Sequence, residues 1–101
     1  MVDSKIRYDP QQLTEYCKKN NISWMAVFGS AVRGDLRDES DLDILVEFRS
    51  YEGLGLFRFM KIQREIGEMF QRQVDLGVRD ALSIYIRDEV LKECEVIYEE
   101  R

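Results

Sequence analysis

Two apolar runs, separated by a Gly-Ser pair and an Asp-x-Asp pair, most strongly constrain how this chain can fold. The first run, Ile22–Phe28, ends at Gly29-Ser30, and the second, Leu42–Phe48, follows Asp41 and encloses Asp43. Short apolar runs bounded by turn residues are typical of strands. Because strand residues two apart point to the same face, Asp41 and Asp43 would place two carboxylates side by side.

Neighbouring carboxylates are unfavourable, because like charges this close repel each other. A divalent cation would remove that conflict. The sequence contains no histidine, which excludes Ser/His/Asp and Cys/His nucleophile schemes and the usual zinc sites. A metal would therefore be held by oxygen atoms, which favours magnesium or manganese.

The chain of 101 residues is long enough for its own core, and we predict a single domain over residues 1–101. Its net charge of -5 argues against avid binding of nucleic acid. No apolar stretch approaches the roughly 20 residues that span a bilayer, and the N-terminus lacks a signal-peptide pattern. Cys17 and Cys94 are far apart, so we interpret them as reduced, mostly buried thiols of a cytoplasmic protein.

Helices and strands alternate in the rest of the pattern. Asp9 and Pro10 suit the cap and the first residue of a helix. The expected elements are a helix over 10–19, a strand over 22–28, a short helix capped by Ser30 and running to about Arg37, a strand over 42–48, a helix over 56–70, a strand over 74–78, a helix from 82 to about 92, and a fourth strand over 94–98 that is hard to tell from helix. This order predicts an α/β (α+β) fold, with helices packed on a mixed sheet of three to four strands.

A third acid, Asp75, lies between Val74 and Leu76 in the predicted third strand. An acid in such a setting is costly to bury unless it is paired, hydrogen-bonded or bound to a metal. If the third strand lies beside the second, Asp41, Asp43 and Asp75 could hold two divalent ions about 4 Å apart. Metal-assisted chemistry on a phosphate substrate would follow.

The turn between the first two strands suits phosphate. Gly29 would let the backbone approach the phosphate oxygens closely. The hydroxyl of Ser30, with the amides that open the short helix, would bind those oxygens. Arg33 would add a charge-assisted contact.

Together these residues resemble a known pattern. Gly29-Ser30, ten intervening residues, Asp41-x-Asp43 and a later strand acid resemble the nucleotidyltransferase superfamily of DNA polymerase beta. The form Gly-Ser-x-x-Arg-Gly, with Ser40 directly before Asp41, is similar to its minimal nucleotidyltransferase (MNT) branch.

The resemblance implies a nucleotidyltransferase-like fold and assigns roles to residues. Asp41 and Asp43 would bind two Mg²⁺ ions, with Mn²⁺ as a substitute, and Asp75 would bind the catalytic ion and help to deprotonate the nucleophile. The nucleotide-binding residues would be Gly29, Ser30, Arg33 and Ser40.

The resemblance also implies a partner. Small MNT proteins are often encoded beside a helical HEPN protein, and some act as antitoxins that transfer AMP from ATP onto a tyrosine of that partner. We therefore expect a metal-dependent nucleotidyltransferase that uses ATP and modifies a HEPN-type protein. The alternative hypothesis is a non-catalytic antitoxin that neutralises its partner by binding and masking it.

Each site residue also has an ordinary structural interpretation. Strand acids can be solvated edge residues, Asp75 and Ser30 can be plain helix caps, and Arg33 can form a surface ion pair with Asp35 or Glu39.

The aromatic residues are expected to serve packing. Trp24, and the group formed by Phe57, Phe59, Met60 and Phe70, are predicted in the core. Exposed members such as Tyr51 or Phe57 would instead mark a partner surface.

Overall fold

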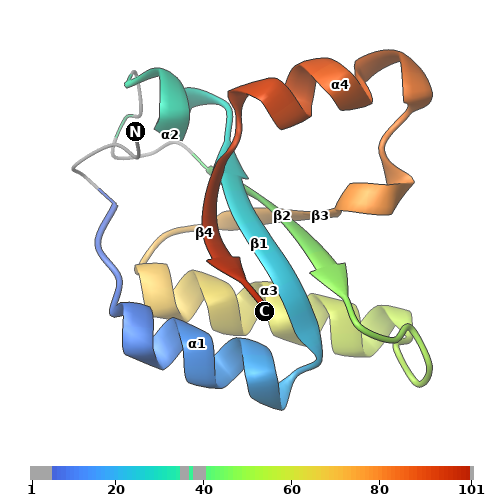
Figure 1. Cartoon of the computed structure of the whole chain (residues 1–101). Coiled ribbons are helices and arrows are strands. Elements are labelled where there is room, and N and C mark those ends of the chain that lie inside the picture. The colour runs from blue at the N-terminus through green and yellow to red at the C-terminus, as the bar shows by residue number, and fades with distance from the viewer. Residues whose placement is uncertain (1–5, 35–36, 38–40, 101) are drawn as a thin grey trace.

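The computed structural model describes residues 6–34, 37 and 41–100, in which helices and strands alternate along the chain (Figure 1). The elements are α1 (Pro10–Lys19), β1 (Ile22–Phe28), α2 (Ser30–Arg33), β2 (Leu42–Phe48), α3 (Leu56–Phe70), β3 (Val74–Val78), the 3-10 helix η1 (Arg79–Ala81), α4 (Ile84–Glu93) and β4 (Glu95–Glu99). The predicted order is confirmed, and the ambiguous last segment forms a strand.

Within the described residues, the strands form one mixed sheet in the order β3-β2-β1-β4. Strand β1 runs antiparallel to both β2 and β4, whereas β2 and β3 are parallel. A parallel pair needs a crossover connection, which α3 supplies. Helices α1 and α3 lie on one side of the sheet, and α4 lies across the other (Figure 1). The predicted mixed sheet packed with helices is confirmed.

Helix α1 begins and ends where the sequence predicts, with Asp9 as its cap. The carboxylate of Asp9 accepts a hydrogen bond of 2.9 Å from the amide of Gln11, and Pro10 opens the helix. This cap satisfies an amide that would otherwise lack a partner. Leu13 and Cys17, one turn apart, are buried, so this face of the helix is fixed against the rest of the core.

The main core lies between the sheet and the helices α1 and α3. Alternate residues of β2 point into it, as the period of two predicts. Its fully enclosed members include Leu13, Cys17, Ile22, Met25, Val27, Leu42, Ile44, Val46, Ile62 and Ile66. Phe70 closes the end of α3 and stacks near Tyr8, with the ring centroids 5.1 Å apart.

The opposite face of the sheet has a much smaller cluster. Its buried members are Trp24, Ala26 and Leu45. The segment of η1 and α4 covers them with side chains that are themselves only partly buried: Leu82, Val90, Leu91 and Cys94, together with Phe28 from β1. Trp24 is therefore a core residue, as predicted.

Three local expectations need correction. The short helix ends at Arg33 instead of about Arg37, because Gly34 adopts a left-handed φ of 81°. The last helix begins at Ile84, because η1 occupies the chain before it.

The third correction concerns α3. Phe59 is partly buried and Phe70 is buried, but Phe57 and Met60 are 88% and 53% exposed. They lie on a helix face that does not contact the sheet, which periodicity alone could not distinguish from the core-facing side.

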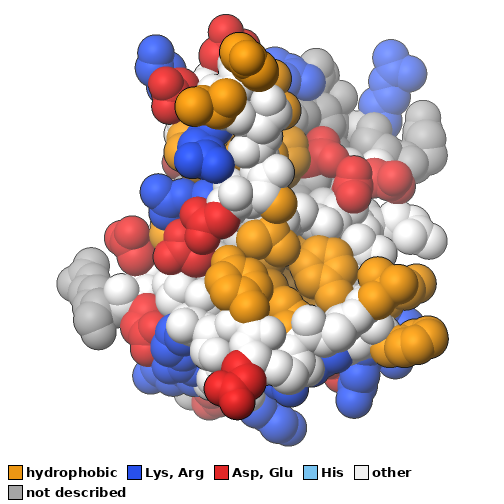
Figure 2. Space-filling model, turned by 90° about the vertical axis from the view of Figure 1, so that its right-hand side faces the viewer, with side chains coloured by type: hydrophobic (Ala, Val, Ile, Leu, Met, Phe, Trp, Pro, Cys, Tyr) orange, Lys and Arg blue, Asp and Glu red, His pale blue; other side chains and the backbone are white. Residues whose placement is uncertain are grey.

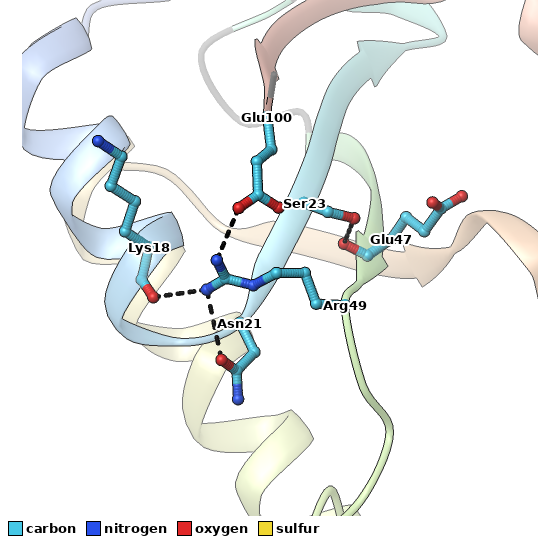
Figure 3. A network of polar contacts seen from close by, with 6 residues as sticks. All are labelled: Lys18, Asn21, Ser23, Glu47, Arg49 and Glu100. Carbon is cyan, nitrogen blue, oxygen red and sulfur yellow. Dashed lines mark hydrogen bonds and ion pairs between the residues drawn. The ribbon is translucent and has the colours of Figure 1, made fainter.

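Arg49 directly follows β2, at the opposite end of the strand from Asp43, and forms a network of polar contacts there (Figure 3). Its guanidinium donates to the carbonyl of Lys18 at 2.8 Å, to Oδ1 of Asn21 at 3.3 Å and to Oε1 of Glu100 at 2.7 Å. The residue thus ties the end of α1 to segments that follow β2 and β4.

Cys17 and Cys94 are both free thiols, as predicted. No helix in the described part of the chain has both the length and the apolar character needed to cross a bilayer. The single domain over 1–101 stays a prediction.

Candidate active site

Two of the predicted acids face each other across neighbouring strands. Asp43 of β2 and Asp75 of β3 are register partners in the parallel pair, so their side chains leave the same face of the sheet. That face is the one crossed by α4, since the alternate residues Ile44 and Val46 of β2 lie in the main core. Asp41 precedes β2 and is exposed, as is Asp75, whereas Asp43 is half-buried.

The raised pKa of Asp43 reflects its charge interactions with the neighbouring acids. Burial raises the pKa of its carboxyl above the ordinary value of 3.8, and the charges of Asp75 and Asp41 raise it further. The guanidinium of Arg33 opposes this shift. Three negative side chains and one positive side chain are therefore close enough to interact electrostatically. This arrangement is expected for a site that receives a cation and an anionic ligand.

Gly29 is held against Asp43 by the geometry of the turn. Its φ is 74°, and a Cβ added there would lie 2.6 Å from Oδ2 of Asp43. Phe28, the preceding residue, is the register partner of Asp43. Any other residue at position 29 would suffer backbone strain and a clash with this carboxylate.

The same glycine directly precedes α2. Its carbonyl accepts hydrogen bonds from the amides of Val32 at 3.1 Å and Arg33 at 3.2 Å. The cap position therefore belongs to Gly29, and Ser30, expected to be the cap, is the first helical residue. Both residues of the Gly-Ser pair lie where β1 ends beside the acids.

Arg33 has a partner that the sequence did not suggest. Its Nη1 lies 3.7 Å from Oε2 of Glu93, the last residue of α4, and both side chains are exposed. The expected alternatives, Asp35 and Glu39, lie outside the described residues, as does Ser40. Glu93 could not have been found from sequence, because 60 positions separate it from Arg33 and nothing local marks it.

The donor set fits a hard dication. Among the residues that the structure describes, no group of three or more Asp, Glu, Cys or His side chains is already arranged to hold a metal ion. The mutual effect on the pKa of Asp43 nevertheless places the carboxylates of Asp41 and Asp75 within its electrostatic reach. Carboxylate oxygens are the ligands that Mg²⁺ and Mn²⁺ prefer.

Comparisons with known proteins identify the family of this chain. The family described as Polymerase beta, Nucleotidyltransferase matches residues 11–101. The protein adenylyltransferase MntA of Thermococcus cleftensis is 35% identical over 74 residues, which cover 73% of this chain and 71% of that protein.

Solved structures of nucleotidyltransferases resemble this fold. A candidate minimal nucleotidyltransferase has a TM-score of 0.70 at 29% identity, with 85% of this chain and 86% of the other covered. The complex of a tri-AMPylated HEPN toxin with an MNT antitoxin from Shewanella oneidensis has a TM-score of 0.63 at 15% identity, covering 89% of this chain and 69% of the other. The second likeness concerns the fold alone.

The family match spans most of the chain, and the Gly-Ser turn lies beside facing strand acids in the structure. The chain therefore belongs to the polymerase beta nucleotidyltransferase family, in its minimal nucleotidyltransferase branch, and is a nucleotidyltransferase.

Proposed function

We propose that this protein transfers AMP from ATP to a hydroxyl of a partner protein, with a tyrosine of a HEPN-type toxin as the acceptor and neutralisation of that toxin as the result. The observation that carries the proposal is the register pairing of Asp43 with Asp75 beside Gly29. The similarity to a protein named adenylyltransferase MntA, and to an MNT antitoxin in complex with an AMPylated HEPN toxin, supports the choice of nucleotide and partner.

In this proposal the residues of the site divide the work. Asp41, Asp43 and Asp75 would hold two Mg²⁺ ions, which when bound offset the charge between the carboxylates and the triphosphate. The amides at Gly29 and Ser30 would bind phosphate oxygens. Arg33, already close to the acids, would add a positive charge toward the same group.

The transfer itself needs one proton acceptor. The hydroxyl oxygen of the acceptor attacks the α-phosphorus of ATP, and its proton passes to a carboxylate oxygen of Asp75. The bond between the α-phosphorus and the bridging oxygen breaks, and pyrophosphate leaves. Asp75 suits this role because it is exposed and therefore accessible to a macromolecular acceptor.

The test uses the full chain, a purified HEPN-type protein from the same genome and ATP labelled at the α-phosphate. We expect Mg²⁺-dependent label on the HEPN-type protein, located by mass spectrometry on a tyrosine, and no label after chelation. The masking alternative predicts that the toxin is neutralised equally well with an ATP analogue whose bond between the α- and β-phosphates cannot be cleaved. Full neutralisation without label would replace the proposed function by masking.

A further inference from the structure

Helix α4 differs from the other long helices in how little of it is buried. None of its residues is buried, whereas α1 and α3 each fix an apolar face in the main core. Its first turn instead exposes three large apolar side chains: Ile84 is 77% exposed, Tyr85 90% and Ile86 48%. A helix in a protein gains most of its stability from the packing of an apolar face. The apolar surface of this turn is not buried, and burying it against another molecule would be favourable.

The place of α4 relates this turn to the active site. Val90 and Leu91 pack against the small cluster that contains Leu45, on the acid-bearing face of the sheet. At its end, Glu93 lies 3.7 Å from Arg33 of α2, beside the carboxylates. The first turn lies seven to nine residues before Glu93, so a rise of about 1.5 Å per residue places it roughly 12 Å from that end. A small acceptor could not reach both places, but a protein could.

The charges around the apolar turn are negative. Asp80, Asp88 and Glu89 are exposed, and the last two follow Ile84 and Tyr85 by one helical turn. Arg87 lies close to these acids, with its Nη2 donating to the carbonyls of Asp80 at 3.3 Å and Leu82 at 3.2 Å, so its single positive charge is outnumbered by three negative ones. The surface is therefore apolar with an acidic rim.

Figure 2 views the side of the molecule where η1 and the first turn of α4 lie. Hydrophobic side chains reach the surface at the top of this view, among charged ones, and a larger hydrophobic area lies at mid-height. An aromatic residue with aliphatic neighbours is a composition typical of binding hot spots. A second copy of the chain that docked through the same turn would place the acidic rim against itself, which is unfavourable.

We propose that the first turn of α4, formed by Ile84, Tyr85 and Ile86 with the acidic rim of Asp80, Asp88 and Glu89, is the docking surface for the acceptor protein. The complementary surface on that protein is an apolar pocket rimmed by lysine or arginine. This inference rests on the proposed function and deepens it, since docking here lays the acceptor over the face that carries Asp43 and Asp75.

The first experiment measures the dissociation constant between the full chain and the purified HEPN-type protein by calorimetry. We expect Tyr85→Ser to weaken binding at least tenfold, which is about 1.4 kcal/mol. The comparison variant is Phe57→Ser, because Phe57 is an aromatic residue of nearly equal exposure on α3. A larger loss of affinity in Phe57→Ser than in Tyr85→Ser would place the acceptor on α3 and overturn the proposal. Equal affinity of wild type and Tyr85→Ser, or no binding by the wild type, overturns the docking proposal.

The second experiment tests the rim. The double variant Asp88→Lys, Glu89→Lys should weaken binding and reduce its dependence on salt, whereas Glu52→Lys in the loop before α3 should do neither. If the chain alone forms dimers that Tyr85→Ser dissociates, a second copy occupies the surface and the proposal is wrong.

Kinetics separate this proposal from the proposed function. In labelled transfer, Tyr85→Ser should raise the KM for the acceptor protein and leave the KM for ATP unchanged. If the wild type binds the HEPN-type protein through Tyr85 but transfers no AMP, the docking surface stands and the proposed function falls. If transfer occurs with the same acceptor KM in both proteins, the function stands and the docking surface falls.

Discussion

The two faces of the sheet are covered to different degrees. On the face toward α1 and α3, a large cluster of buried apolar side chains from the strands and both helices forms the main core. On the face toward α4, only a small cluster around Trp24 and Leu45 is buried, and Asp75 remains exposed. A complete cover would desolvate the carboxylates at a high cost. The comparison teaches that stability is concentrated on one face so that the other can stay open for chemistry.

The largest effect is expected when one acid of the open face is removed. Asp43→Asn removes a proposed metal ligand, and we expect AMP transfer to the HEPN-type protein to fall about a thousandfold or more, since several kcal/mol of transition-state stabilisation are lost. The rate of labelled transfer at saturating Mg²⁺ and ATP measures the effect, and a melting curve checks that the variant is folded.

Glu47→Gln is the matched control for this variant. Glu47 is on the same strand and the same face, is also half-buried, and pairs with Arg79 at 3.6 Å at the far end of the sheet. Its loss should leave the transfer rate within a few fold of wild type. Equal losses in the two variants would mean that position along the strand does not matter, contrary to the proposed site.

Core substitutions test the other side of the comparison. Ile66→Ala, on the enclosed face of α3, should lower the free energy of unfolding by about 2–5 kcal/mol through lost burial and a cavity. Leu91→Ala, on the partly buried side of α4, should cost less than about 1.5 kcal/mol. Urea denaturation gives both values, and similar costs would show that the two faces contribute equally to stability.

A smaller effect is expected where Arg49 joins the end of the sheet (Figure 3). Arg49→Met removes hydrogen bonds to the carbonyl of Lys18, to Asn21 and to Glu100, and should cost about 1 kcal/mol of unfolding free energy. The exposed pair of Arg64 with Glu68 is the control, since Arg64→Met should cost less than about 0.5 kcal/mol. AMP transfer should survive both changes. A loss of activity in Arg49→Met without unfolding would contradict the view that this end of the sheet is separate from the active site.

The smallest effect concerns the stability of the apo protein. Because burial and the neighbouring acids raise the pKa of Asp43 above its ordinary 3.8, the native state binds its proton more tightly than the unfolded chain. The free energy of unfolding therefore falls as pH rises from about 4 through the raised pKa. Asp43→Asn should increase the melting temperature by a few degrees near neutral pH and have little effect near pH 4.

Added Mg²⁺ with ATP should raise the melting temperature of the wild type but not of Asp43→Asn. Melting curves that do not respond to Mg²⁺ and ATP in either protein would contradict the assigned ligands.

Most elements were predictable because their signals are local. The bounds of β1 and β2 follow from apolar runs between turn residues, and α1 follows from Asp9 and Pro10. The end of α2 was predicted too late, although Gly34 directly after Arg33 is the usual signal for a helix end and adopts the left-handed φ that this role requires. Phe57 was predicted in the core and is exposed, because helical spacing gives a face but does not say what that face contacts.

For this protein, the order of small and acidic residues along the chain was enough to indicate a phosphate turn, facing acids and the nucleotidyltransferase family. Only the tertiary structure decided that β3 pairs parallel with β2, so that Asp75 faces Asp43. It alone placed Glu93 beside Arg33 and left the first turn of α4 exposed. The physical reason is that strand pairing and helix docking depend on contacts between residues distant in sequence, and periodicity carries no record of such contacts.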